Sequence, residues 1–359
     1  MKSFSIRFRT LRRTFFLFAF TSVLAASAPA QEISLQKSNT TENLRGVSTV
    51  SDKIAWASGA HGTYLRTIDG GTSWQVAHVP GAEDLDFRDV KAFSADVAYL
   101  LSIGTGKLSR IYKTTNGGKN WALQFTNADS KAFFDCMAFW DQDHGLAISD
   151  PVGKEFILIA TDDGGTHWSD VFPKKMPPAF EGEGAFAASG TCLIAQGNSN
   201  AWFATGGSVA RVFHSTDRGK TWTAAITPIV HGNASSGIFS IAFRDEKHGL
   251  AAGGDYKSPE MPGPHLAFTE DGGVTWKLSE LAPQPFFSAV AFAPTDSHRL
   301  LVVGPTHAAE ASDIEGKQWP KTWDVNLNAI SFSPTGDAFA VGPKGTIVKI
   351  CKLRDVAPY

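Results

Sequence analysis

The sequence predicts an all-β protein, a seven-bladed β-propeller, and three observations support this fold. The pattern Ser/Thr-x-Asp-x-Gly-x-x-Trp, called an Asp box, recurs along the chain. The tryptophans of its six copies are separated by 47, 47, 54, 54 and 43 residues, which matches the length of one four-stranded blade. No segment shows the sustained helical period of an amphipathic helix.

The six Asp boxes differ in completeness. Four copies carry every residue of the pattern, at 67–74, 161–168, 215–222 and 269–276. Asn116 replaces the acid in the copy at 114–121, and Ile314 replaces it in the copy at 312–319. We expect a structural role, because the glycine supplies positive φ, the acid accepts turn hydrogen bonds and the tryptophan wedges between blades. These structural residues are Asp69, Asn116, Asp163, Asp217, Asp271, Trp74, Trp121, Trp168, Trp222 and Trp276.

Smaller repeated pieces predict the strands of each blade. Apolar inner strands that end in phenylalanine are expected at 90–93, 136–139, 240–243 and 289–292. Beyond Trp319 three further strands are expected, at 329–332, 338–342 and 346–349. That last blade lacks a fourth strand, and we expect residues 33–36 to supply it, which closes the ring without an open edge. The 329 residues after Ala30 then give 47 residues for each of seven blades.

The N-terminal residues 1–30 predict a secretory signal peptide. Five basic side chains precede an apolar run from Phe15 to Ala26, and Ala28-Pro29-Ala30 is a typical cleavage pattern. We therefore expect cleavage after Ala30, one propeller domain over 31–359, and a secreted or periplasmic monomer. The apolar run is too short to span a membrane, and no later stretch approaches the roughly 20 apolar residues that a bilayer requires.

Charge and motifs restrict the partners. Without residues 1–30 the chain has 28 Lys+Arg against 35 Asp+Glu, a net charge of about −7, which argues against a nucleic-acid partner because phosphate binding needs a basic face. The segment 182–187 fits Gly-x-Gly-x-x-Ala but does not lie between a strand and a helix, so it indicates no dinucleotide site. Haem-type Cys-x-x-Cys-His is absent from the sequence. We expect no cofactor and no metal.

The cysteines and two histidines have structural explanations. Cys136, Cys192 and Cys351 lie in apolar, strand-like segments, which favours buried free thiols. A Cys136–Cys192 bridge between neighbouring blades is the alternative, because export would permit a disulfide. His144 and His248 occur in a repeated turn, where we expect them to cap the turn or pack rather than bind metal.

The two faces of the predicted disc differ. The first-to-second and third-to-fourth turns, including the Asp boxes, lie on one face, here called the box face. The second-to-third turns and the connections between blades lie on the other, here called the insertion face, because it receives the long segments at 149–155, 173–183, 255–265 and 305–310. Loops longer than a turn requires are often functional, so the insertion face is the candidate binding surface.

The inner strands begin on the insertion face, around the mouth of the central channel. Aligning them by their apolar residues places Arg45 and Arg88 at equivalent positions, with Asp89 and Asp135 one step later. Two guanidiniums there can bind a carboxylate of a ligand or partner protein. The alternative is ion pairing between blades with Asp89 and Asp135. The insertions add three acids to the candidate binding site, and no catalytic residue is assigned: Asp150, Glu183 and Asp255.

The repeated phrases Phe-x-Asp-x-x-x-Gly-x-Ala-x-Gly and Thr-x-Asp-Gly-Gly-x-x-Trp resemble those of the photosystem II assembly and stability factors, a family of exported seven-bladed propellers. The resemblance extends over nearly the whole chain after Ala30 but rests on blade-building residues. It implies a non-catalytic scaffold that binds another protein.

Asp boxes are also similar to those of sialidases and other glycoside hydrolases, so a carbohydrate-active or carbohydrate-binding propeller is the alternative, with Asp135, Asp150 and Glu183 as its acids. Sialidase chemistry needs three arginines, a tyrosine nucleophile and an acid/base. Arg45 lies in Leu-Arg-Gly-Val rather than Arg-Ile-Pro, and none of the five tyrosines begins a late inner strand. A propeller oxidoreductase is less favoured, because no residue indicates its cofactor.

Overall fold

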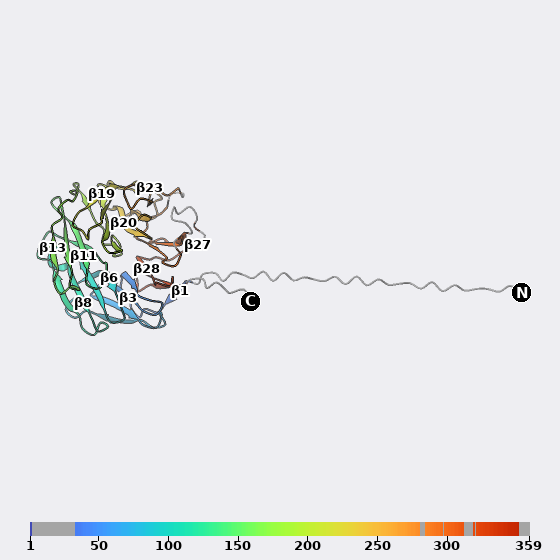
Figure 1. Ribbon diagram of the computed structural model, residues 1–359. Helices are drawn as coiled ribbons and strands as arrows, with labels where there is room; N and C mark the ends of the chain where they lie inside the picture. Colours follow the sequence, from blue (N-terminus) through green and yellow to red (C-terminus); the bar gives the residue numbers. More distant parts are fainter. Residues whose placement is uncertain (2–32, 281–283, 297, 312–318, 320, 352–359) are drawn as a thin grey trace. The chain divides into compact units, whose positions relative to one another are not determined.

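The fold was analysed in a computed structural model, which describes Met1 and residues 33–280, 284–296, 298–311, 319 and 321–351. Residues 31–359 belong to one compact unit. Figure 1 shows its sheets side by side, with β6, β20 and β28 near the centre and β8, β13, β19 and β23 at the outside. The predicted signal peptide at 1–30 falls on residues that, Met1 apart, lie outside the described part.

Seven antiparallel sheets make up the unit, each with four consecutive strands except where noted. Blade 1 consists of β2 (Leu44–Thr49), β3 (Ala55–Gly59), β4 (Thr63–Thr67) and β5 (Gln75–His78). Blade 2 consists of β6 (Asp86–Ala92), β7 (Ala98–Ile103), β8 (Arg110–Thr114) and β9 (Ala122–Thr126), with a 3₁₀ turn at Gly106–Leu108 between β7 and β8. Blade 3 consists of β10 (Phe134–Phe139), β11 (Gly145–Val152), β12 (Glu155–Thr161) and β13 (Ser169–Val171). Blade 4 consists of β15 (Leu193–Gln196), β16 (Asn200–Ala204), β18 (Arg211–Ser215) and β19 (Thr223–Ile226).

The remaining blades follow the same order. Blade 5 consists of β20 (Ser236–Phe243), β21 (Gly249–Asp255), β22 (Leu266–Thr269) and β23 (Lys277–Leu278). Blade 6 consists of β24 (Ala289–Phe292), β25 (Leu300–Val303), β26 (Ala308–Ala311) and β27 (Lys321–Trp323). Two short strands extend blade 5 beyond β20: β14 (Glu183–Gly184) and β17 (Gly206–Gly207). Blade 7 is β28 (Ala329–Phe332), β29 (Ala338–Val341), β30 (Ile347–Ile350) and β1 (Ile33–Gln36).

The seven inner strands form a closed circle. Each contacts the inner strands on both sides, in the order β2, β6, β10, β15, β20, β24, β28 and back to β2. The prediction of an all-β, seven-bladed propeller is therefore confirmed. In blade 7, β1 pairs antiparallel with β30, with Ile33 opposite Ile350 and Gln36 opposite Ile347. Within the described residues, no helix is long and apolar enough to cross a membrane.

The five Asp boxes inside the described residues have the same geometry. In blade 1, Thr67 Oγ1 donates to Asp69 Oδ1 at 2.8 Å and accepts from Gly71 N at 2.9 Å, while Ser73 N donates to Asp69 Oδ1 at 2.9 Å. Gly71 needs its positive φ of 86° for this turn. Asn116 uses its amide oxygen in the same way, accepting from Asn120 N at 2.9 Å. The sixth box lies outside the described residues except for Trp319.

The box tryptophans pack against the preceding blade. Trp74 meets Phe339 of blade 7 edge to face, with ring centroids 5.5 Å apart. Trp121 meets Tyr64 of blade 1 at 5.0 Å. Separate apolar clusters fill the spaces between neighbouring blades, and Trp222 lies fully buried in the cluster shared by blades 3 and 4. Each box thus stabilises both its own turn and a contact between blades.

Cys136 and Cys192 form a disulfide, with Cα atoms 6.0 Å apart, so the expectation of buried free thiols is wrong for this pair. The alternative of a bridge between neighbouring blades is the one observed. Each cysteine stands three residues before an inner-strand residue that pairs near the start of the second strand: Phe139 pairs with Gly145, the first residue of β11, and Ala195 pairs with Ala201, the second residue of β16. Equivalent positions on adjacent inner strands bring the two sulfur atoms within bonding reach.

Candidate functional site

A β-bulge near the start of the inner strand sets the side chains at the channel mouth. The register with the second strand skips one residue in blades 1, 2, 3 and 5, and the skipped residues are Arg45, Arg88, Asp135 and Phe239. A bulge turns its extra residue away from the regular alternation. Arg45 and Arg88 are therefore equivalent, as the alignment predicted. Asp135 is itself the residue that the register skips in blade 3, so it occupies the same position as the two arginines and not the next one, which the alignment predicted.

Two guanidiniums come together at this mouth. Arg88 Nε donates to Asp86 Oδ2 at 2.8 Å, so its ion-pair partner is Asp86 rather than Asp89 or Asp135. Burial, followed by the charge of Arg88, lowers the pKa of Arg45 to about 10. The Nε of Arg45 is buried without a hydrogen-bond partner. Arg88 is thus ion-paired with Asp86, whereas Arg45 keeps an unsatisfied nitrogen, and a guanidinium in this state can bind an additional anion.

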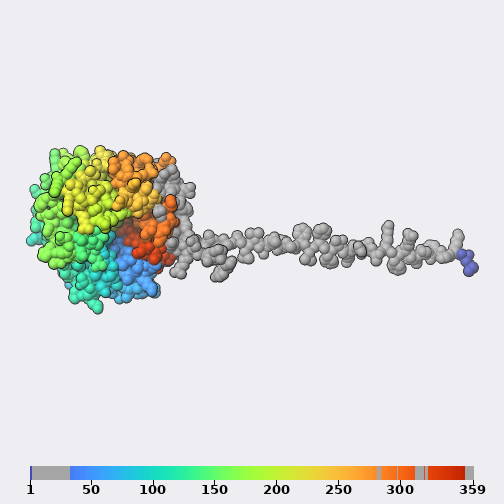
Figure 2. Space-filling view, viewed as in Figure 1, coloured from blue at the N-terminus to red at the C-terminus, as the bar shows by residue number. Residues whose placement is uncertain are grey.

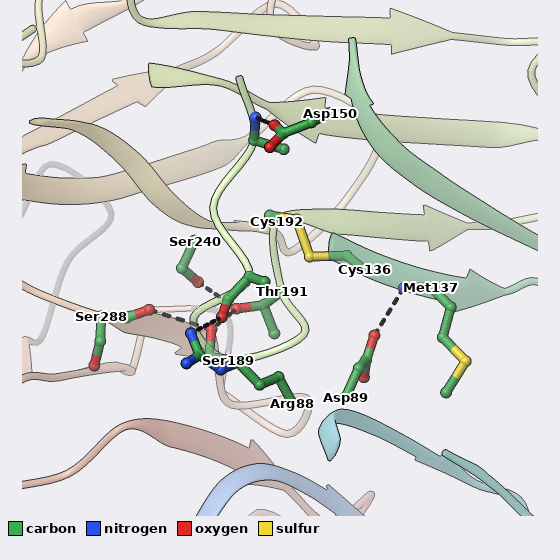
Figure 3. Close-up of a disulfide and its surroundings, with 12 residues drawn as sticks. Arg88, Asp89, Cys136, Met137, Asp150, Ser189, Thr191, Cys192, Ser240 and Ser288 are labelled. Carbon is green, nitrogen blue, oxygen red and sulfur yellow. Dashed lines mark hydrogen bonds between the residues drawn. A yellow bond between two sulfur atoms is a disulfide. The ribbon is translucent and has the colours of Figure 1, made fainter. Parts of the chain in front are cut away.

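A segment that the sequence did not predict closes the channel at this end. Residues 185–191, here called the plug, lie between β14 and β15 and cross from blade to blade (Figure 3). Ala185 N donates to Asp150 Oδ1 of blade 3 at 2.8 Å, and Ser189 Oγ donates to the Ser288 carbonyl of blade 6 at 3.2 Å. Thr191 Oγ1 lies 2.7 Å from Ser240 Oγ of blade 5. These contacts hold the plug on both sides of the channel.

Arg88 and Gly190 fix the plug to blade 2. Arg88 Nη1 donates to the Ala187 carbonyl at 3.0 Å. Gly190 has φ of 74°, and a Cβ atom there would overlap the carboxylate of Asp89. Only glycine satisfies both demands. The disulfide at Cys192 anchors the residue that follows the plug, as Figure 3 shows.

Three carboxyl groups beneath the plug are difficult to ionise. Burial raises the pKa of Asp89 to about 7, although its Oδ2 accepts from Met137 N at 2.8 Å. Burial, and then the charge of Asp150, raises the pKa of Asp135 well above its ordinary value. Burial also raises the pKa of Asp150 to about 6. Asp135 Oδ2 has no hydrogen-bond partner, so this carboxyl group is the least satisfied of the three.

Asp135→Asn should stabilise the protein at alkaline pH. A carboxyl group whose pKa is raised by folding opposes folding once the pH exceeds its unfolded value of about 3.9. The free energy of unfolding of the wild type should therefore fall as pH rises from about 5 to 8. We expect Asp135→Asn to raise it by at least about 1 kcal/mol at pH 8, and by much less at pH 5.

Denaturant unfolding at both pH values measures this effect. Asp84→Asn, which changes an exposed acid, is the control and should leave the pH dependence unaltered. Asp89 and Asp150 should retain part of the wild-type slope in Asp135→Asn, because their pKa values are shifted in the same direction. Equal effects of Asp135→Asn at pH 5 and pH 8 would show that ionisation of this carboxyl group is not the cause.

Two further predicted site residues lie elsewhere. Glu183 is buried and ion-paired with Arg211, with Oε2 2.6 Å from Nη2, so it belongs to the internal framework rather than to a binding surface. Asp255 lies at the end of β21, where its carboxylate accepts hydrogen bonds from Lys257 N at 2.9 Å and from Asn233 Nδ2 at 3.3 Å. The mouth thus gathers Arg45, Arg88, Asp89, Asp135 and Asp150 from the predicted set.

One of the long insertions does not lie wholly on the insertion face. Segment 173–183 begins beside the Asp box of blade 4, where Lys174 N donates to the Lys220 carbonyl at 2.9 Å. It reaches the insertion face only later, where Ala179 N donates to the Lys154 carbonyl at 2.9 Å. Its assignment to the insertion face is therefore wrong for its first residues. This happens because β13 is short. It pairs only with Leu158, Ile159 and Ala160 of β12, so the chain leaves blade 3 before it reaches the insertion face.

Aromatic side chains surround the plug. Phe186 of the plug stacks on Phe239 with centroids 4.0 Å apart, and Phe286 meets Phe239 edge to face at 4.7 Å. Tyr256 contacts both Phe186 and Phe239, and about half of its surface, 49%, is exposed. Aromatic residues beside arginines are typical of the energetic centres of protein interfaces.

The two histidines of the repeated turns bind within those turns. His144 Nδ1 lies 2.8 Å from Asp141 Oδ1, and His248 Nδ1 lies 2.8 Å from Asp245 Oδ1. Both therefore cap a turn, as predicted. Within the described residues, no three His, Cys, Asp or Glu side chains gather in a metal-binding group.

Residues 213–224, which include the whole Asp box of blade 4, match the sequence family described as BNR/Asp-box repeat. The chain carries the BNR repeat. Curated proteins offer no significant match to the sequence. The BNR match and the seven sheets together support the fold class predicted from the tryptophan spacing.

Solved structures are similar to this propeller over most of its length. YCF48 bound to D1 peptide has a TM-score of 0.65 at 16% identity, covering 91% of this chain and 100% of that one. YCF48 from Cyanidioschyzon merolae has a TM-score of 0.61 at 17% identity, covering 89% and 98%. The GH74 xyloglucanase from Xanthomonas campestris has a TM-score of 0.62 at 18% identity, covering 92% of this chain and 55% of that one. At these identities the likeness concerns the fold alone, and it agrees with the propeller architecture that the sequence predicted.

Proposed function

We propose that this protein is an exported, non-catalytic propeller scaffold that binds another protein at the channel mouth. The observation that carries the proposal is the pair Arg45 and Arg88, two equivalent bulge residues with one adjacent carboxylate and one unsatisfied guanidinium nitrogen. A carboxylate of the partner, from an acidic side chain or a chain end, would complete this group. The exposed ring of Tyr256 beside the plug adds an apolar contact.

Two further points support the proposal. A propeller of similar fold, YCF48, has a structure with a D1 peptide bound, so a seven-bladed framework of this kind accommodates a peptide. The basic and apolar residues ahead of Ala30 favour export by a cleaved signal peptide. The net charge of about −7 after cleavage favours a protein partner over a nucleic acid.

Affinity capture from envelope extracts tests the proposal. The wild-type protein, with Gln31 as its first residue by mass spectrometry, should retain a stable partner that also binds when both proteins are purified. Arg45→Ala plus Arg88→Ala should abolish that binding. Arg218→Ala plus Lys220→Ala removes the same charge from an Asp-box turn and should leave binding intact. Unchanged capture by the Arg45/Arg88 variant would show that the assignment of the site is wrong.

A carbohydrate-active propeller is the competing function. The neighbouring acids Asp135 and Asp150 have raised pKa values, a property of acid catalysts. However, Asp135 is only 1% exposed beneath the plug, and Glu183 is engaged by Arg211, which favours the scaffold. A glycan array and chromogenic glycosides distinguish the two. Hydrolysis that Asp135→Asn abolishes would overturn the scaffold proposal.

A further inference from the structure

The central channel is a blind cavity. It has a volume of about 370 Å³ and is lined by all seven inner strands. Ser189 and Gly190 of the plug, both buried, form one end. At the opposite end the lining includes the half-buried Phe292 and Phe332 and the exposed Pro294. Solvent therefore enters the channel from the box face, away from the Arg45 and Arg88 site.

One layer of the channel wall holds a single charged side chain. Lys91 precedes Ala92, which pairs with the first residue of the second strand, Ala98. The corresponding residues of the other six blades are small or aliphatic and uncharged: Ser48, Ala138, Ile194, Ala242, Ala291 and Ser331. In blade 4 the second strand begins one residue earlier, so Ile194 precedes Ala195, which pairs with the second residue of that strand, Ala201. These neighbours leave room in the channel for a ligand beside the lysine.

The ammonium group of Lys91 has no contacting counter-ion in the described part of the chain. No hydrogen bond or ion pair within those residues involves its Nζ atom. Burial lowers the pKa of Lys91, and the charge of Asp89 opposes this only in part. Asp89 itself accepts from Met137 N and lies against Gly190 of the plug. An ammonium group in such surroundings gains from any anion that reaches it.

The route from the box face to Lys91 carries aromatic side chains together with the polar Ser48, Gln196 and Ser331. Phe243, Phe292 and Phe332 line the cavity at the ends of β20, β24 and β28. The aliphatic Ile194 lies in the same layer as the lysine. A cavity of this size, with aromatic side chains near its open end and a charged group further in, resembles a small-molecule site.

We propose that this channel binds a small amphiphilic monoanion, a free acid whose anionic group contacts Lys91 and whose apolar body lies against the phenylalanines near the box face. The plug separates this ligand from the insertion face. The site is thus independent of the protein-binding function proposed for Arg45 and Arg88, and either proposal can fail without the other.

Isothermal titration with octanoate tests the proposal, with octylamine as a ligand of equal length and opposite charge. The wild type should bind one octanoate per chain and bind octylamine at least about tenfold more weakly. Lys91→Met keeps the length of the side chain without its charge and should weaken octanoate binding at least about tenfold. Lys119→Met, at an exposed lysine in the Asp box of blade 2, should bind octanoate like the wild type.

Each other outcome overturns the proposal. Absence of octanoate binding to the wild type would exclude a site for this class of ligand. Equal affinities for octanoate and octylamine would show apolar binding without an anionic anchor. Unchanged binding to Lys91→Met, or an equal loss in Lys119→Met, would place the octanoate outside the channel. Denaturant unfolding of Lys91→Met confirms that a loss of binding does not come from a loss of fold.

Discussion

Glu183→Ala should lower the free energy of unfolding by about 3 to 5 kcal/mol, because it leaves Arg211 buried without its counter-ion. The two side chains are 0% and 6% exposed. Glu183 Oε1 also accepts from Thr205 Oγ1 at 2.7 Å, and its Oε2 accepts from Phe180 N at 2.9 Å. The substitution therefore removes a charge and also leaves several buried donors unsatisfied. Denaturant unfolding at neutral pH measures the loss.

A double variant and a surface ion pair serve as controls. Glu183→Leu plus Arg211→Met removes both charges and should recover much of the loss, since apolar pairs commonly replace buried ion pairs without penalty. Glu270→Ala breaks a pair with Lys277 whose side chains are 49% and 65% exposed, and it should leave stability nearly unchanged because solvent screens an exposed pair. A loss below about 1 kcal/mol in Glu183→Ala would contradict the argument from burial.

Removal of the disulfide should have the second large effect. The bridge joins residues 56 apart in sequence, and a closed loop of this length restricts the unfolded chain enough to contribute about 3 to 4 kcal/mol. Cys136→Ala plus Cys192→Ala should lose this stability in guanidinium unfolding. The bridge also anchors the residue after the plug, so the double variant should expose the plug to faster amide hydrogen exchange.

A reducing agent supplies the control for this prediction. It should lower the stability of the wild type to that of the double cysteine variant and leave the double variant unchanged. If it lowered both proteins by the same amount, the bridge would not be the source of the stability. Slow exchange of the plug amides in the double variant would show that hydrogen bonds to Asp150, Ser240 and Ser288 hold the plug without the disulfide.

Repetition made the fold predictable. The Asp boxes fix the third-to-fourth turn of a blade by local hydrogen bonds such as that from Ser73 N to Asp69, and their spacing gives the blade length. Inner strands appeared as apolar runs that end in phenylalanine, and Phe139, Phe243 and Phe292 end β10, β20 and β24 as expected. Local signals of this kind can be recognised in the sequence without knowledge of tertiary contacts.

The site was less predictable because it depends on contacts between blades. The plug carries no periodic pattern, and its small residues gain meaning only where Gly190 meets Asp89. The bulge that moves Asp135 into the position of Arg88 is a property of strand pairing. Arg211 resembles any first residue of a strand until its distance to Glu183 is known. Lys91 did leave a signal, as a charged residue where other inner strands carry alanine, serine or isoleucine.

The pairing of β1 with β30 has a mechanical consequence. Ile33 and Ile350 form the first pair of this ladder and lie nearest to the two chain ends. A pulling force applied through both ends would load the hydrogen bonds of the ladder one after another, as in opening a zipper, rather than all together. Under such tension the ladder between β1 and β30 would be the first part of the ring to open. Once opened, it would leave β30 as an unpaired edge that is able to add strands from other chains.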